Sequence, residues 1–151
     1  MIRKIIFIIS VFFLLACAAT EKEEIISVQV YKSNGLVDIP FDVIESTFWD
    51  FKNKGDLDSL MITNSKTKEF SNVINELDMQ KLEEKPFMNP EYAIVLSYET
   101  KNDTIYMDEN LKKGYLTQKK LMFKDDNDLI YQLLIKEEFL TERTIYFRKN
   151  N

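Results

Sequence analysis

Residues 92–98, Tyr-Ala-Ile-Val-Leu-Ser-Tyr, restrict the possible folds of this chain more than any other segment. The segment has the length of a β-strand, and apolar residues occupy both of its alternating sets of positions. A strand that is apolar on both faces is typical of the interior of a sheet rather than its edge. We therefore expect this segment to be the central strand of the fold.

Two further segments have the spacing of amphipathic helices. In residues 66–77 the apolar positions recur every three or four residues, after a possible cap at Asn64-Ser65. A second helix should follow residues 125–128, whose acidic side chains suit the positive end of a helix dipole. The two apolar stripes are Phe70, Val73, Ile74 and Leu77 in the first helix, and Leu129, Ile130, Leu133 and Leu134 in the second.

The remaining periodic segments predict short strands joined by tight connections, which favours antiparallel pairing. Residues 42–55 predict one or two helical turns that begin at Asp42 and end at Gly55, and residues 79–89 read as a polar connector. The fold class is therefore α+β: an antiparallel sheet of about five strands, with two amphipathic helices packed on one face, in a single domain of residues 25–151. The strands are expected at residues 25–31, 58–63, 104–107, 115–117 and 121–123, with weaker strand patterns at residues 36–41 and 143–148.

Charge excludes some classes of partner. The 151-residue chain has 20 basic and 25 acidic residues, a net charge of −5. Residues 1–16 contain Arg3 and Lys4 and no acid, so the remainder carries a net charge of −7. General nucleic-acid binding and a polybasic membrane patch both need clustered Lys and Arg. We therefore expect neither a nucleic-acid partner nor electrostatic attachment to a membrane.

The chain lacks the residues of most catalytic sites. It has no histidine, which rules out Ser-His-Asp and Cys-His catalysis within the chain, and three glycines could hardly build a phosphate loop. Carboxylates are the remaining catalytic groups. The adjacent acids Glu83-Glu84 and Glu137-Glu138 do not face each other on a strand or a helix, so we interpret them as surface residues. A pair assembled from distant acids remains open.

Asp125, Asp126 and Asp128 form the densest group of side-chain oxygens and are weak candidates for a metal site. The segment lacks the spaced ligands, the central glycine and the closing glutamate of a calcium-binding loop. We favour helix capping over metal binding and predict no cofactor. Trp49, beside Phe48 and Phe51, is either an exposed recognition element or a lid over the edge of the core, and we favour the lid.

The first sixteen residues have the pattern of a secretory signal. Arg3 and Lys4 precede an apolar run, residues 5–16, which is broken only by Ser10. The run is shorter than the ~20 apolar residues that span a bilayer. A charged start, a short apolar run and a small residue before the cleavage point are typical of a cleaved signal peptide.

Leu14-Leu15-Ala16-Cys17 resembles the lipobox of bacterial lipoproteins, and Cys17 is the only cysteine of the chain. The resemblance implies that the Cys17 thiol receives a diacylglycerol, that the chain is cut before Cys17, and that the new amino terminus is usually acylated; palmitate is the acyl chain expected. Residues 17–24 would then be a lipidated tether. An ordinary cleaved signal, or a membrane anchor with a chance cysteine, is the alternative interpretation.

The tether also carries information on location. Ala18 stands where many lipoproteins of the inner membrane have an aspartate, which implies transport to an outer membrane if the host has one. Lys22-Glu23-Glu24 is similar to a Lys-acidic-acidic tract that marks surface export in some lipoproteins; a solvated linker is the alternative. We expect a membrane-anchored lipoprotein of the bacterial envelope, held through the lipid on Cys17.

Three functions remain open for the domain. The first is a non-enzymatic binding or accessory module for an envelope protein, peptide or glycan. The second is a carboxylate-dependent hydrolase, and the third is a small inhibitor or immunity-type protein. An enzyme should show a concave pocket with two or more converging acids, whereas a binding module should show an exposed apolar patch or a free strand edge.

Overall fold

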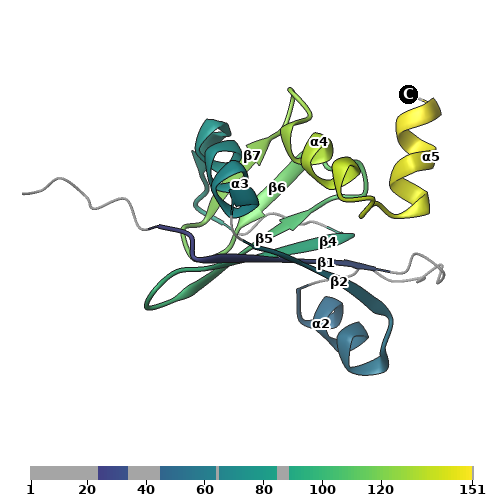
Figure 1. Ribbon diagram of the computed structural model, residues 1–151, viewed down its shortest axis with the longest axis horizontal. Coiled ribbons are helices and arrows are strands. Elements are labelled where there is room, and N and C mark those ends of the chain that lie inside the picture. Colours follow the sequence, from purple (N-terminus) through teal and green to yellow (C-terminus); the bar gives the residue numbers. More distant parts are fainter. Residues whose placement is uncertain (1–23, 34–44, 64, 85–88, 151) are drawn as a thin grey trace, which may run out of the picture.

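Strand β4, Tyr92–Ser97, lies inside a seven-stranded antiparallel sheet, with two strands on one side and four on the other. The computed structural model describes residues 24–33, 45–63, 65–84 and 89–150, and within them the fold is α+β, with this sheet and four helices (Figure 1). The other strands are β1 (Ser27–Ser33), β2 (Leu57–Ile62), β3 (Asp78–Lys81), β5 (Asn102–Met107), β6 (Lys113–Leu116) and β7 (Leu121–Lys124). The helices are α2 (Glu45–Lys54), α3 (Ser65–Glu76), α4 (Leu129–Lys136) and α5 (Glu142–Asn150).

The strand order is β2-β1-β4-β5-β6-β7-β3. Strands β4 to β7 form a meander of consecutive hairpins, β1 and β2 extend it beyond β4, and β3 pairs with β7 at the opposite edge. The expected central strand is thus confirmed, but the expected number of about five strands is too low. Strand β3 overlaps the predicted polar connector of residues 79–89, so that prediction is wrong for residues 79–81.

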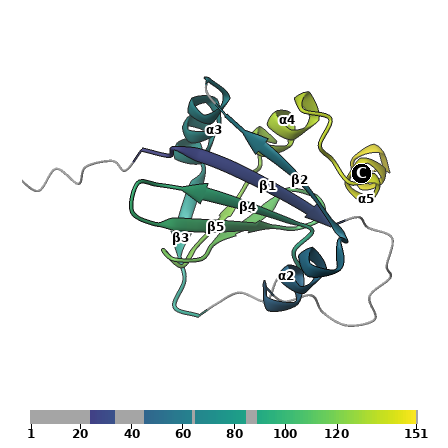
Figure 2. The same cartoon turned by 60° about the horizontal axis from the view of Figure 1, so that its bottom comes forward.

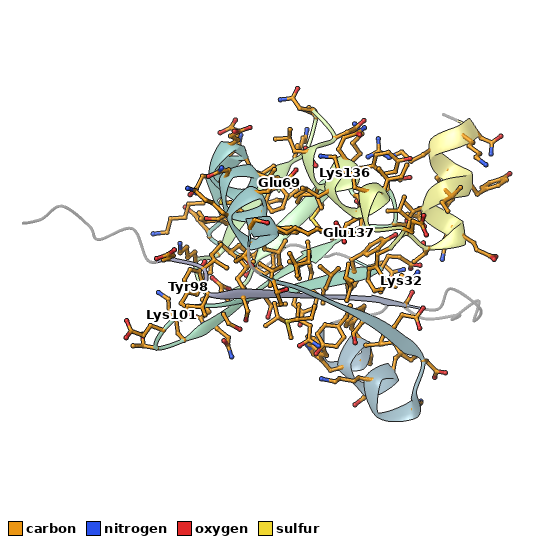
Figure 3. All side chains as sticks on the ribbon, in the orientation of Figure 1. Lys32, Glu69, Tyr98, Lys101, Lys136 and Glu137 are labelled. Carbon is orange, nitrogen blue, oxygen red and sulfur yellow. The ribbon has the colours of Figure 1, made fainter. Side chains whose placement is uncertain are left out.

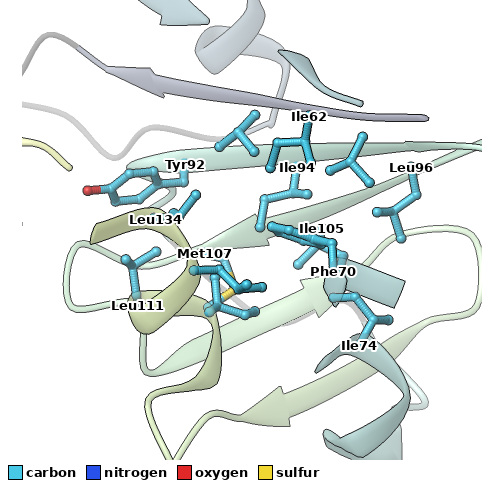
Figure 4. Packing of buried hydrophobic residues seen from close by; sticks show 14 of the residues in the cluster. Ile62, Phe70, Ile74, Tyr92, Ile94, Leu96, Ile105, Met107, Leu111 and Leu134 are labelled. Carbon is cyan, nitrogen blue, oxygen red and sulfur yellow. The ribbon is translucent and has the colours of Figure 1, made fainter. Parts of the chain in front are cut away.

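Helices α3 and α4 cover one face of the sheet, as their apolar stripes predict (Figure 1). Side chains from both helices meet alternate residues of the central strands, and Ile94, Leu96 and Ile105 are fully buried there. Figure 4 shows this main core, with Phe70 and Ile74 of α3 and Leu134 of α4 packed over the sheet. Ion pairs Lys66–Glu137 (2.6 Å) and Lys136–Glu69 (3.0 Å) join the two helices at the surface (Figure 3).

Helix α2 packs on the opposite face of the sheet (Figures 1 and 2). It is ten residues long, which corrects the expected one or two turns and the expectation of helices on one face only. Gly55 ends it with a positive φ of 80°. Its N–H bonds Lys52 O, and the next N–H, of Asp56, bonds Phe51 O, which is the paired hydrogen bonding of a Schellman end. Gly55 therefore closes the helix as predicted.

Helix α5 includes residues 143–148, for which the sequence pattern predicts a last strand. The Thr141 hydroxyl oxygen accepts the N–H of Thr144 at 3.0 Å and so caps the first turn of the helix. Thr144 is fully buried, while the next two residues, Ile145 and Tyr146, are both exposed. Alternating burial is therefore absent from this segment, and the strand prediction is wrong.

Several predictions concern residues outside the described ranges. These are the signal of residues 1–16, most of the tether of residues 17–24, the short strand at 36–41, the helix start at Asp42 and the possible helix cap at Asn64. Among the described residues, no helix combines the length and the apolar character that crossing a bilayer requires.

Candidate functional site

A buried network of hydroxyl groups joins the start of β4 to the start of α5. The Thr141 N–H donates to the Tyr92 hydroxyl at 2.8 Å, and that hydroxyl lies 2.6 Å from the Thr144 hydroxyl. Thr144 donates its own proton to the Glu109 carbonyl at 2.6 Å. Because Thr144 has only one hydroxyl proton, Tyr92 must be the donor in the Tyr92–Thr144 hydrogen bond. The network holds residues 137–141, which we call the α4–α5 connection, against the end of the sheet.

Glu91 precedes Tyr92 and lies against the same connection. The residue is only 8 % exposed, and its Oε1 atom has no hydrogen-bond partner among the residues that the structure describes. Burial raises the pKa of Glu91, while the hydroxyls of Ser33 and Thr141 and the charge of Arg143 act in the opposite direction. The charge of Glu109 adds to the increase in this pKa. Glu91 is therefore an acid whose protonated form the fold favours.

Glu109 and Arg143 complete this group of polar side chains, and they form an ion pair. The Arg143 Nε atom lies 2.7 Å from Glu109 Oε2, and both side chains are partly exposed. Lys32 closes another side of the α4–α5 connection, because its ammonium group donates to Leu140 O at 3.0 Å and lies 4.6 Å from the centre of the Phe139 ring. We call the following residues the Glu91–Tyr92 cluster: Glu91, Tyr92, Glu109, Thr141, Arg143 and Thr144.

The cluster combines features of a catalytic site with features of a structural contact. An acid with a raised pKa beside a second carboxylate is the arrangement that acid–base catalysis uses. However, Glu91 is covered by the α4–α5 connection, and Glu109 is engaged with Arg143. Sequence reasoning missed this cluster, because its members come from three separate segments and no spacing relates them. An acid directly before the most apolar strand was the only local signal.

The acidic segment that we had considered as a weak metal site caps helix α4. The two carboxylate oxygens of Asp125 accept the N–H groups of Leu129 and Ile130, at 2.8 and 2.7 Å. Asp126 is exposed, and Asp128 pairs with Arg148 at 2.7 Å and also with Lys112. The carboxylates thus point to different partners. Nowhere in the described ranges do three or more His, Cys, Asp or Glu side chains gather in a way that could hold a metal ion.

Trp49 is a lid over a second, smaller core beneath helix α2. Its indole N–H donates to the Tyr106 hydroxyl at 2.7 Å, and its ring meets Tyr31 and Phe48 edge to face. The Lys52 ammonium lies 4.7 Å from the centre of the Tyr31 ring and donates to the Tyr31 hydroxyl at 3.1 Å. The favoured interpretation of Trp49 as a lid therefore agrees with its contacts.

The two edges of the sheet differ. Edge strand β3 is only four residues long and has a charged residue at each end, Asp78 and Lys81, which is a common protection against unwanted pairing. Edge strand β2 is six residues long, contains one charged residue, and exposes 52 % of the Met61 side chain. Within the described part of the chain, β2 pairs with β1 alone, so one row of its backbone groups has no strand partner there.

Comparison of the chain with protein-family models, with curated proteins and with solved structures found no significant match. The interpretation of both the cluster and the β2 edge therefore depends on the residues themselves. Cys17, the predicted site of lipid attachment, lies outside the described residues.

Proposed function

We propose that this chain is a lipid-anchored protein of the bacterial cell envelope, with a non-enzymatic binding or accessory domain. The observation that carries the proposal is the leader: a charged start, a short apolar run, and Leu14-Leu15-Ala16 directly before the only cysteine, Cys17. The described fold begins at residue 24, seven residues after Cys17. A short tether of this kind would keep the domain close to the membrane.

The β2 edge is the surface that best suits a binding role. Its outer row of backbone N–H and C=O groups, which no strand of the described residues pairs, can add a strand from a partner, and this is a common mode of peptide recognition. Exposed Met61 offers an apolar contact beside them. The partner class that fits this surface is an extended segment of another envelope protein, because backbone groups in a row recognise another backbone in the extended conformation.

The lipid anchor is tested by labelling cells with a palmitate analogue. The full chain should incorporate the label and partition with membranes, because two or three acyl chains give stable anchoring. The Cys17→Ser variant should lose the label and accumulate as unprocessed precursor. The matched control is Ser10→Ala, which changes the leader but not the cysteine and should keep the label. Labelling of the Cys17→Ser chain would disprove the lipoprotein assignment.

The predicted export tract needs a separate experiment. Replacing Lys22, Glu23 and Glu24 together with alanine should leave palmitate labelling intact. Loss of protease access to the domain on whole cells would then identify these residues as a surface-export signal. Unchanged access would show that they are only a spacer.

The binding edge is tested by photo-crosslinking in cells. A photo-reactive residue at Ser59, which is exposed on β2, should give a defined adduct with one envelope protein. Met61→Lys should abolish the adduct, because a charge on an edge strand opposes strand addition. Gln80→Lys on the β3 edge is the control and should leave the adduct unchanged. An adduct that survives Met61→Lys would argue against binding at β2, and a partner enzyme that the chain inactivates would identify an inhibitor.

A carboxylate-dependent hydrolase is the second candidate, and the Glu91–Tyr92 cluster is the observation that favours it. Glu91 would be the general acid and Glu109 the second carboxylate, the two groups that glycoside hydrolysis needs. Purified protein should then release fragments from cell-wall glycan, and Glu91→Gln should reduce the rate at least a hundredfold. Release that is equal in the wild-type and Glu91→Gln proteins would exclude this mechanism.

A further inference from the structure

Glu91 lies where separate parts of the fold meet. Ser33 ends β1, Glu109 lies between β5 and β6, and Thr141 and Arg143 belong to the start of α5; all four contribute to the electrostatic environment of the Glu91 carboxyl. The residue is nine-tenths buried, and within the described part of the chain its Oε1 atom has no hydrogen-bond partner. A buried carboxylate without a full set of donors is unfavourable when it is charged, and much less so when it is protonated.

We propose that Glu91 is a pH-dependent switch that controls how firmly the α4–α5 connection and the first turn of α5 are held against the sheet. Protonated Glu91 is compatible with the closed arrangement seen in the structure. Ionised Glu91 favours opening of the connection, because opening gives the carboxylate access to water. The inference is independent of the lipid anchor and of the proposed binding edge.

Of the charged groups around Glu91, one lowers its pKa and another raises it. Together they do not cancel the increase in pKa that burial causes. Arg143 favours ionisation, but its guanidinium is shared with Glu109, 2.7 Å away, whose negative charge opposes ionisation of Glu91. The Ser33 and Thr141 hydroxyls provide only partial compensation. Burial also raises the pKa of Tyr92, so its phenol remains neutral over the pH range in which Glu91 titrates. Burial is therefore the dominant effect on Glu91.

The direction of the pH effect follows from proton linkage. The pKa of Glu91 is raised above its ordinary value of 4.5 in the closed state, whereas in the open state it returns toward that value. Closed protein thus binds more protons than open protein between those two values. The closed arrangement is most stable at low pH, and it loses stability as the pH rises toward the raised pKa. Above the raised pKa the opening equilibrium reaches a plateau.

Ionisation of Glu91 should loosen only the first turn of helix α5. The last turn of α5 is held independently, because Arg148 pairs with Asp128 at 2.7 Å and its guanidinium lies 4.5 Å from the centre of the Tyr131 ring. The first turn depends on Thr141 and Thr144, which contact Tyr92 beside Glu91. Loosening is therefore expected to begin at the first turn of α5.

Amide hydrogen exchange of the full protein tests this inference. The opening equilibrium of the Ile145 amide, which donates to Thr141 O at 3.1 Å, should increase by up to tenfold per pH unit above pH 4.5, after correction for intrinsic exchange. It should then become constant at higher pH. Glu91→Gln is uncharged at every pH, so its corrected opening equilibrium should be independent of pH.

Glu142→Gln is the matched control, because Glu142 is an exposed acid in the first turn of the same helix. That variant should keep the wild-type pH dependence, whereas Glu109→Gln should shift it to lower pH by removing a neighbouring negative charge. Direct NMR titration of the Glu91 carboxyl in the wild-type protein gives a second measurement, which does not depend on the folding of any variant. A Glu91 pKa at or below 4.5, or an unchanged pH profile in Glu91→Gln, would overturn the proposal.

Discussion

The Tyr92 hydroxyl accepts the Thr141 N–H at 2.8 Å, across 49 residues of sequence. One end of this contact is the first residue of the central strand, and the other immediately precedes the last helix. The phenol ring is fully buried in the main core (Figure 4). A single side chain thus couples apolar packing with the position of helix α5.

Tyr92→Phe should destabilise the domain without changing its shape. The substitution keeps the ring but removes the acceptor of the Thr141 N–H and the donor to Thr144. Leaving such buried groups unpaired costs about 1–3 kcal/mol. Urea unfolding should show this loss at an unchanged slope. Tyr146→Phe, at an exposed position of α5, should stay within ~0.5 kcal/mol of wild type.

Substituting Asp125 by alanine should reduce stability much more than substituting Asp126, although the two residues are adjacent. Asp125→Ala removes the carboxylate that accepts the first N–H groups of α4, and losing such a cap costs about 0.5–2 kcal/mol. Asp126 is exposed, so Asp126→Ala should have little effect. The melting temperature should also be the same in calcium and in chelator. An increase of several degrees in calcium would indicate a metal site after all.

Gly114→Ala should be destabilising because strand β6 passes close to two side chains. A Cβ atom at this position would lie 2.1 Å from Phe123 Cζ and 2.6 Å from Met107 Sδ. Accommodating an additional methyl group in a tightly packed core costs about 1–3 kcal/mol. Thermal unfolding measures the effect. The double variant Gly114→Ala with Phe123→Leu should recover part of the loss, and no recovery would show that the strain lies elsewhere.

The only tryptophan of the chain allows the docking of α2 to be followed by fluorescence. Phe48 is fully buried and contacts both Trp49 and Tyr106. Phe48→Ala should cost about 3–5 kcal/mol and shift the tryptophan emission to longer wavelength as the indole becomes hydrated. Asp50→Ala, at an exposed position of the same helix, is the control. Unchanged emission in Phe48→Ala would mean that the docking of α2 on the sheet does not depend on the Phe48 contacts.

Ionisation of Asp128 should stabilise the folded protein, whereas ionisation of Glu91 destabilises the closed arrangement, so the two residues make stability depend on pH in opposite directions. Desolvation opposes ionisation of Asp128, but hydrogen bonds from Lys112 and Arg148 and the charges of these two residues outweigh it and lower its pKa. The folded state therefore gains stability from ionised Asp128 above the ordinary value of 3.8, and loses that stability as the pH falls through the lowered pKa. Unfolding of Arg148→Met between pH 2 and 5 should show a weaker acid dependence than wild type.

Local sequence patterns predicted the elements that local chemistry determines. The central strand, the stripes of α3 and α4, the Asp125 cap and the Gly55 helix end all depend on residues close together in the chain. Strand β3 was not predicted because its sequence, Asp-Met-Gln-Lys, has a single apolar residue. It becomes a strand by pairing with β7, in which Phe123 lies opposite Met79.

The two failures at the C-terminal end have a common cause. Residues 143–148 alternate in a way that suggests a strand, but the Thr141 cap and the burial of Thr144 favour a helix. The same contacts create the Glu91–Tyr92 cluster, which joins residues 91, 109, 141 and 143. Both the helix and the cluster are products of tertiary contact, so single-sequence patterns contain little information about either.

The strand order also determines the sequence in which the sheet can assemble. The meander β4–β7 contains only neighbouring pairs, whereas β1 must find β4 and β3 must find β7, each across at least 39 residues of chain. Such long-range pairings form slowly because loop closure must precede their energetic gain. During synthesis from the N-terminus, β1 would therefore have only β2 as a partner, and β3 would have none, until the second half of the chain arrived. The N-terminal strands are the stretch that a chaperone would have to protect during that interval.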